Sequence, residues 1–154
     1  MSASKPKKFC VAGPCDPLDH YMLPALPRLP EVQDLVNSEE YFVLHAPRQS
    51  GKTTSIYAAV AQINAEKKYY ALSCSLARLD KVTDNGQAMS SIIGLIYGAL
   101  RNAKFLGLKK TFVDGALASI SQDPDFKESP IQLWLNFLSE RIKKDLVIFF
   151  DEAD

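Results

Sequence analysis

The chain has 154 residues, 47% of them apolar and 23% charged, which is the size and composition of one ordinary globular domain. Its 18 lysine and arginine residues balance 18 aspartate and glutamate residues, which excludes a global attraction to nucleic acid or an acidic membrane. No stretch approaches the roughly 20 apolar residues of a membrane span, and the basic N-terminus lacks a following apolar run of signal-peptide length.

The first part of the chain, residues 1–30, is rich in proline and is predicted to be an irregular leader. A core domain is expected over residues 31–154. The three cysteines include no Cys-x-x-Cys pair, which indicates reduced thiols and a cytoplasmic protein. A metal site at Cys10 and Cys15 is the less favoured alternative, because the chain has only two histidines, His20 and His45.

Alternating strands and helices are predicted for the first half of the core. A short helix is expected over 31–38, and the apolar run 40–45 is typical of a strand. A helix over 52–67 follows, with four apolar residues spaced to form one buried face: Ile56, Ala59, Val60 and Ile63. Residues 69–75 are predicted to be a second strand.

The second half repeats this alternation. Asp84 or Asn85 is expected to cap a helix whose buried face comprises Met89, Ile92, Ile93, Ile96 and Leu100. A weaker helix is predicted over 112–120. Ser129 and Pro130 are typical of another helix start, ahead of an apolar face of Ile131, Trp134, Leu135, Leu138 and Ile142. The continuous apolar run 146–150 predicts a strand buried on both faces, so we expect an α/β fold with a mainly parallel sheet.

The loop between the first strand and its helix carries the clearest chemical signal. It comprises Ala46, Pro47, Arg48, Gln49, Ser50, Gly51, Lys52, Thr53 and Thr54. This segment resembles the phosphate-binding Walker A pattern G-x-x-x-x-G-K-[ST], with alanine at the first glycine, and it is expected to stand between a strand and a helix as that pattern requires. The alanine is tolerable if its φ is negative.

The chemistry of such a loop predicts binding of ATP, or another nucleoside triphosphate, with Mg²⁺. Backbone amides and the positive end of the helix would face phosphate oxygens. Gly51 would allow a close approach, Lys52 would reach the β- and γ-phosphates, and Thr53 would place its hydroxyl on Mg²⁺.

An acidic pair after the last predicted strand completes the candidate site. The apolar run ending in Asp151 and Glu152 is typical of a Walker B motif. Asp151 would hold Mg²⁺ and Glu152 would polarise the attacking water, which favours an ATPase over a small-molecule kinase. Weaker candidates are His20, Tyr21 and Arg28 for an adenine pocket, with surface packing as the favoured alternative, and Arg48 for a phosphate contact.

With both motifs in place, the chain resembles the predicted AAA-like ATPases of prokaryotes, which belong to the additional-strand class of P-loop proteins. The resemblance lies in His20-Tyr21-Met22, the 41–44 run, the 46–54 loop and the final Phe149-Phe150-Asp151-Glu152-Ala153-Asp154. It implies a three-layer P-loop sandwich, ATP binding and hydrolysis, with Lys52 and Glu152 as catalytic residues.

The family's strand order, 5-1-4-3-2, places a fourth strand between the strands that carry the two motifs. That strand, and any arginine finger, would follow Asp154, so we expect an N-terminal fragment with slow or absent hydrolysis. It would depend on further C-terminal domains or on self-association, unless the two motif strands pair directly.

Two other functions remain open from the sequence. One is a nucleotide-gated switch without significant turnover. The other is a DEAD-box-like helicase, because residues 151–154 spell that motif. However, residues 75–80 do not match the RNA-contacting segment of those helicases. No Asn-Lys-x-Asp segment is present to read guanine, so ATP is the expected nucleotide.

Overall fold

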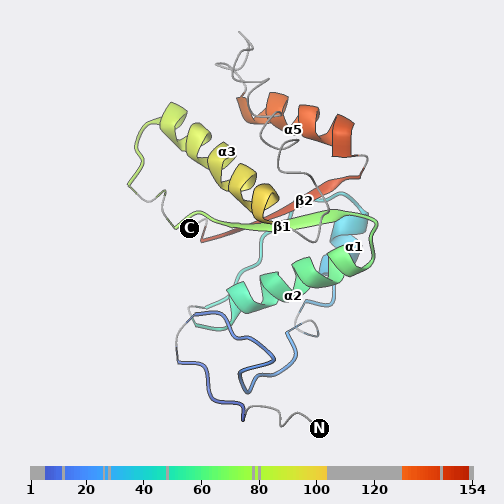
Figure 1. Cartoon of the computed structure of the whole chain (residues 1–154), viewed down its shortest axis with the longest axis vertical. Helices are drawn as coiled ribbons and strands as arrows, with labels where there is room; N and C mark the ends of the chain where they lie inside the picture. The colour runs from blue at the N-terminus through green and yellow to red at the C-terminus, as the bar shows by residue number, and fades with distance from the viewer. Residues whose placement is uncertain are drawn as a thin grey trace. The chain divides into compact units, whose positions relative to one another are not determined.

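The computed structural model describes residues 6–11, 13–25, 27, 29–47, 49–77, 79, 81–103, 130–142 and 144–152. The chain forms two compact units, residues 1–62 and 63–154, and their boundary falls inside helix α2, Lys52–Ala65 (Figure 1). The helix predicted over 112–120 lies outside the described residues.

The leader in the first unit is irregular, as predicted. Within its described residues it contains one isolated parallel bridge, between Lys8 and His20. The Lys8 amide donates to the Asp19 carbonyl at 3.0 Å, and the Tyr21 amide donates to the Lys8 carbonyl at 2.9 Å. These bonds close a loop in the chain between residues 8 and 21.

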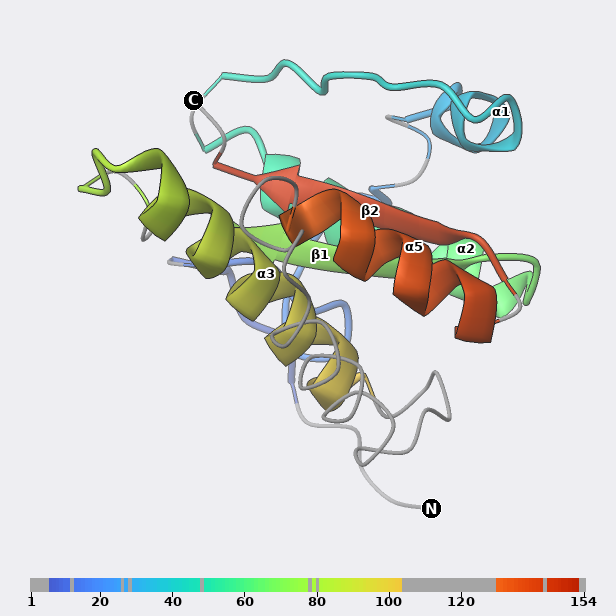
Figure 2. The same ribbon diagram turned by 90° about the horizontal axis from the view of Figure 1, so that it is seen from above.

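Helix α1, Val32–Asn37, confirms the short helix predicted here, with Val32 and Val36 buried. The strand predicted over 40–45 is wrong, because residues 41–47 belong to no strand in the described part of the chain. Figure 2 shows this segment running from α1 as a long stretch of irregular backbone. Tyr41 and Val43 are exposed, whereas the intervening Phe42 is half-buried. The side chains thus alternate as in a strand, but a strand also requires a hydrogen-bonded partner.

Helix α2 forms where the apolar spacing predicted it. Ile56, Ala59 and Ile63 are buried along one face, whereas Val60 is only half-buried. The helical hydrogen bonds begin with the Ser55 amide donating to the Gly51 carbonyl at 2.9 Å.

The second unit contains a parallel sheet of two strands, β1, Tyr70–Ser75, and β2, Leu146–Asp151. Both strands were predicted. Their register pairs Tyr70 with Leu146 and Ser75 with Asp151, so the carboxyl ends of both strands meet at one edge. The fold is therefore mixed α/β with a small parallel sheet.

Helices α3, Asn85–Asn102, and α5, Pro130–Ile142, lie between the strands in sequence and pack on one face of the sheet (Figures 1 and 2). Asp84 caps α3, as predicted, by accepting from the Gln87 amide at 2.8 Å. The buried cluster that these helices form with the sheet comprises Leu72, Cys74, Ile93, Ile96, Leu100, Ala103, Leu138 and Ile142.

Two predicted core residues are exposed. Met89 lies in the first turns of α3, before the helix reaches the cluster, and it is 44% exposed. Phe150 is 41% exposed while its neighbour Phe149 is buried, so β2 is not covered on both faces at this end. Successive strand side chains point to opposite faces, which explains the difference. Among the described residues, no helix is long and apolar enough to cross a membrane.

Candidate phosphate-binding loop and acidic strand ends

Two described residues of the 46–54 loop have a left-handed backbone. Gln49 and Gly51 both have left-handed φ values, 60° and 86°. The Ser50 amide donates to the Pro47 carbonyl at 3.3 Å, which tightens the turn. Alternation of left- and right-handed residues turns successive amides toward a common point, the geometry that binds anions. Only glycine adopts such φ values without strain, so Gly51 matches the backbone and Gln49 carries strain that the loop must hold.

The N-terminal end of α2 adds a favourable field at the same place. The helix has 14 residues and no acidic residue in its first turn. Its positive end is therefore not neutralised locally, and anions are stabilised there. Ala46 is not among the residues with positive φ, so its methyl group fits where the pattern usually has glycine.

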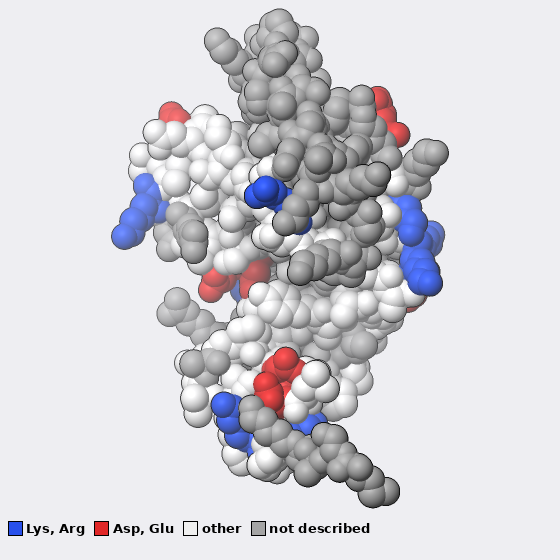
Figure 3. Space-filling view, in the orientation of Figure 1, with Lys and Arg blue, Asp and Glu red and all other residues white. Residues whose placement is uncertain are grey.

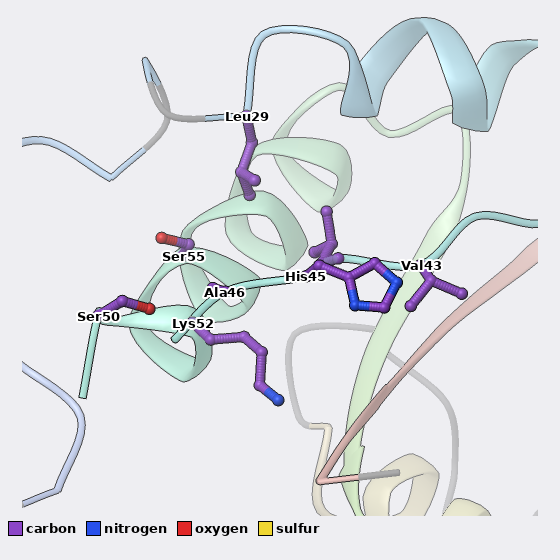
Figure 4. A pocket seen from close by; sticks show the side chains of 8 residues that line it. Leu29, Val43, His45, Ala46, Ser50, Lys52 and Ser55 are labelled. Atoms are coloured by element: carbon purple, nitrogen blue, oxygen red, sulfur yellow. The ribbon is translucent and has the colours of Figure 1, made fainter. Parts of the chain in front are cut away.

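A cavity of about 390 Å³ opens beside this loop, within the first unit. It is lined by Leu29, Val43, Leu44, His45, Ala46, Ser50, Lys52 and Ser55. Its volume falls in the range of small-molecule sites, roughly 300–1,000 Å³. Figure 4 shows the Lys52 side chain extending from the first turn of α2 away from Leu29. The cavity thus combines apolar walls with a lysine, a histidine and two hydroxyl groups.

Thr53 and Thr54, the two threonines of the motif, lie in the first turn of α2 and are half-buried. The Thr54 hydroxyl accepts a hydrogen bond from the Cys15 amide at 3.1 Å. The leader is therefore attached directly to the motif, a contact between residues 39 positions apart that no local sequence signal predicts.

The acidic pair occupies the carboxyl end of β2 in the second unit. Asp151 is 6% exposed and its Oδ1 accepts from the Glu152 amide at 3.1 Å. Glu152 is exposed and has a left-handed φ of 58°. A non-glycine residue in that region is uncommon, and such conformations cluster at functional sites.

Ser75 is a residue of this edge that sequence reasoning missed. Its hydroxyl donates to Glu152 Oε2 at 2.9 Å, from the last position of β1. The register places Ser75 opposite Asp151, which brings the hydroxyl within reach of the next residue. The signal that could have found it is positional, because polar residues that end neighbouring parallel strands meet at one edge of the sheet.

The residues predicted for an adenine pocket are only partly described. Tyr21 is exposed and its ring lies 5.3 Å from that of Phe9, tilted by 43°. The His20 Nδ1 atom accepts from the Asp16 amide at 3.0 Å, so this nitrogen is used within the leader. Arg28 and Arg48 lie outside the described residues. The structure therefore adds Phe9 as a second exposed ring beside Tyr21.

Charged side chains give no support for a nucleic-acid surface on the face that Figure 3 presents. The lysine and arginine side chains drawn there lie in several separate groups, with acidic groups between them. Nucleic-acid binding faces cluster positive charge instead. In the described part of the chain, no group of three or more His, Cys, Asp or Glu side chains could hold a metal ion.

These features define a mixed α/β chain with a left-handed turn before helix α2 in one unit and an acidic strand end in the other. Comparison with protein-family models, with curated protein sequences and with solved structures found no match for this chain.

Proposed function

We propose that this chain is a Mg-ATP-binding P-loop ATPase module of the AAA-like kind, with slow or absent hydrolysis. Residues 46–54 would bind the phosphates, with Lys52 on the β- and γ-phosphates. Thr53 and Asp151 would hold Mg²⁺, and Glu152 would polarise the attacking water. The observation that carries the proposal is the backbone of the loop, which turns left-handed at Gln49 and Gly51 directly before a helix without an acidic first turn.

The donor chemistry of the proposed metal ligands fits Mg²⁺. A threonine hydroxyl and an aspartate carboxylate are the hard oxygen ligands that Mg²⁺ prefers. Mg²⁺ usually takes one or two protein ligands and completes its shell with water and substrate phosphates. A site built from few protein groups is therefore consistent with the absence of a larger ligand cluster in the described residues. When bound, the ion would neutralise charge on the phosphates.

Strand pairing supports the additional-strand class. In the expected order, the strand after the phosphate-loop helix and the strand with the acidic pair are neighbours. β1 and β2 are those two segments, and they pair in parallel.

The hydrogen bond from Ser75 supports slow turnover. It occupies one oxygen of the carboxylate that would activate water. A general base must lie within hydrogen-bond reach of the water whose proton it takes, and the oxygen bound by Ser75 is already engaged. We therefore expect turnover below about 1 s⁻¹, under ordinary enzyme rates.

Titration calorimetry with Mg-ATP tests the proposal. Wild type should bind, and Lys52→Ala should weaken binding by at least about tenfold, because it removes charge-assisted contacts to phosphate. Lys81→Ala is the matched control, since Lys81 is an exposed lysine outside the loop, and its affinity should be unchanged. A folded wild type that does not bind Mg-ATP, or a Lys52→Ala variant that binds equally well, would contradict the proposal.

A further inference from the structure

The cavity beside the 46–54 loop combines apolar and charged parts of its wall. Leu29, Val43 and Leu44 supply apolar side chains, whereas Lys52 supplies a charged one. Figure 4 shows the Leu29 side chain on one side of Ala46 and the Lys52 side chain extending on the other. A ligand that fills this space would therefore place an apolar part near Leu29 and an anionic part near Lys52.

Much of the apolar surface at this cavity is accessible to a ligand. Val43 is 75% exposed, and Leu29 and Leu44 are half-buried. An apolar group that covers these side chains removes their surface from water, and this burial stabilises a complex. The apolar part of the wall can thus contribute to affinity.

A buried hydroxyl group also lines the cavity. Ser55 is 7% exposed, and its amide donates to the Gly51 carbonyl at 2.9 Å. No hydrogen bond of the Ser55 hydroxyl occurs within the part of the chain that the structure describes. Most buried hydroxyl groups in proteins are hydrogen-bonded, because an unsatisfied one costs free energy. The position of Ser55 at the cavity wall leaves its hydroxyl for a polar atom of a ligand.

We propose that this cavity binds the nucleobase of the nucleotide whose phosphates bind the 46–54 loop. A nucleobase has an apolar face and polar edge atoms. Its face would pack on Leu29 and Val43, and an edge atom would hydrogen-bond to the Ser55 hydroxyl, which can donate or accept. Base binding at this cavity rests on the proposed function and adds the residues that contact the base.

These residues differ from those that the sequence indicated for the base. His20 and Tyr21 are not among the residues that line the cavity, and His20 Nδ1 already accepts from the Asp16 amide at 3.0 Å. The base would instead contact aliphatic side chains, one from the end of the leader and one from the segment that precedes the 46–54 loop. Aliphatic side chains give no motif in the sequence that marks them as ligand contacts.

The first experiment compares Mg-ATP with Mg-tripolyphosphate, which has the phosphates without a base, by titration calorimetry of the full chain. Wild type should bind ATP at least about tenfold more tightly, because the base buries apolar surface. Leu29→Ala should weaken ATP binding by about tenfold and leave tripolyphosphate binding unchanged. Leu23→Ala is the matched control, since Leu23 is an exposed leucine of the same unit that does not line the cavity, and it should match wild type.

Ser55→Ala tests the hydroxyl contact in the same assay. It should weaken ATP binding severalfold and leave tripolyphosphate binding unchanged, because one hydrogen bond to the base is lost. Its melting temperature should not fall, since the hydroxyl it removes has no partner among the described residues. A lowered melting temperature with an unchanged ratio of the two affinities would show that Ser55 has a structural role only, and would overturn its contact with the base.

The remaining outcomes separate base binding from the proposed function. Equal affinities of wild type for ATP and tripolyphosphate, or a loss in Leu29→Ala that both ligands share, would overturn base binding at this cavity and leave phosphate binding by the loop intact. If a folded wild type binds neither ligand, the proposed function fails, and the base site that rests on it fails as well.

Discussion

Individual side chains at the carboxyl edge of the sheet determine how the proposed chemistry would run. Ser75 ends one strand and Glu152 follows the other, and a hydrogen bond of 2.9 Å joins them. The serine hydroxyl is a positioning group, because it contacts the carboxylate rather than a reacting atom. Removing the hydroxyl tests two alternatives. Either the contact keeps Glu152 from activating water, or it holds Glu152 in the position in which it activates water.

Ser75→Ala should raise ATP turnover severalfold, because Glu152 regains the carboxylate oxygen that the serine occupies. Steady-state phosphate release measures this effect.

Two further variants interpret that result. Glu152→Gln should reduce turnover by about 100-fold or more in either background, because it removes the general base, and should leave Mg-ATP affinity nearly unchanged. Ser73→Ala, on the same strand, should match wild type. If Ser75→Ala lowers turnover instead, the serine holds Glu152 in its working position.

At the scale of elements, β1 is stabilised on both of its edges. One edge pairs with β2 through the parallel ladder. The other is bonded at Ala71 by the side chain of Asn64, in the last turn of α2. The Asn64 Nδ2 atom donates to the Ala71 carbonyl at 2.9 Å, and its Oδ1 accepts from the Ala71 amide at 3.0 Å. A single amide side chain thereby takes the place of a neighbouring strand at one position and protects an exposed edge.

Asn64→Ala should reduce the free energy of unfolding by about 2–3 kcal/mol, because it leaves the amide and carbonyl of the buried Ala71 without these partners. Asn102→Ala is the control, since Asn102 is an exposed asparagine in the last turn of α3, and it should change stability by less than about 0.5 kcal/mol. Urea unfolding followed by circular dichroism measures both. Equal small losses would show that solvent replaces the Asn64 bonds at no cost.

For the whole molecule, apolar burial is distributed unevenly between the two units. The buried cluster of helices α3 and α5 with the sheet lies in residues 63–154. Most of the large exposed apolar side chains lie in residues 1–62: Phe9, Val11, Leu18, Tyr21, Leu23, Tyr41, Val43 and Tyr57. Because apolar burial is the main favourable term in folding, we expect stability to reside chiefly in the second unit.

The stability of this core should depend on pH in the alkaline range, because the core contains the thiol of Cys74. Burial raises the pKa of the Cys74 thiol to about 11, from the ordinary value of 9.0. As pH rises between these two values, the unfolded chain releases a proton that the folded chain retains, so stability falls. The contribution of the protonated Cys74 thiol to the stability of the folded chain is complete below pH 9 and is lost as pH rises toward 11.

Urea midpoints measured from pH 8 to pH 11, in wild type and in Cys74→Ala, test this expectation. Cys74→Ala should be less stable at pH 8, because it removes buried volume. Its stability should nevertheless fall less steeply with pH, since tyrosines and lysines titrate in both proteins alike. Parallel pH profiles would show that Cys74 ionises normally in the folded chain.

The sequence alone determined the features that depend on local order. The helices beginning at Lys52, Asn85 and Pro130, and the strands at Tyr70 and Leu146, follow from periodicity, capping and apolar runs. Helical hydrogen bonds join residues four apart, so a short stretch contains the information that specifies them. The loop motif could also be recognised from a short stretch, because its glycine, lysine and threonines are adjacent in the chain.

The tertiary structure decided everything that depends on partners distant in sequence. The 40–45 segment has the composition of a strand but forms none, because a strand exists only where another backbone completes its hydrogen bonds. The contacts of Ser75 with Glu152, Asn64 with Ala71, and Cys15 with Thr54 each arise from the course of the folded backbone. Only the position of Ser75 at a strand end gives a sequence signal for one of these pairs. The energy that selects all three contacts is gained only when the chain has folded.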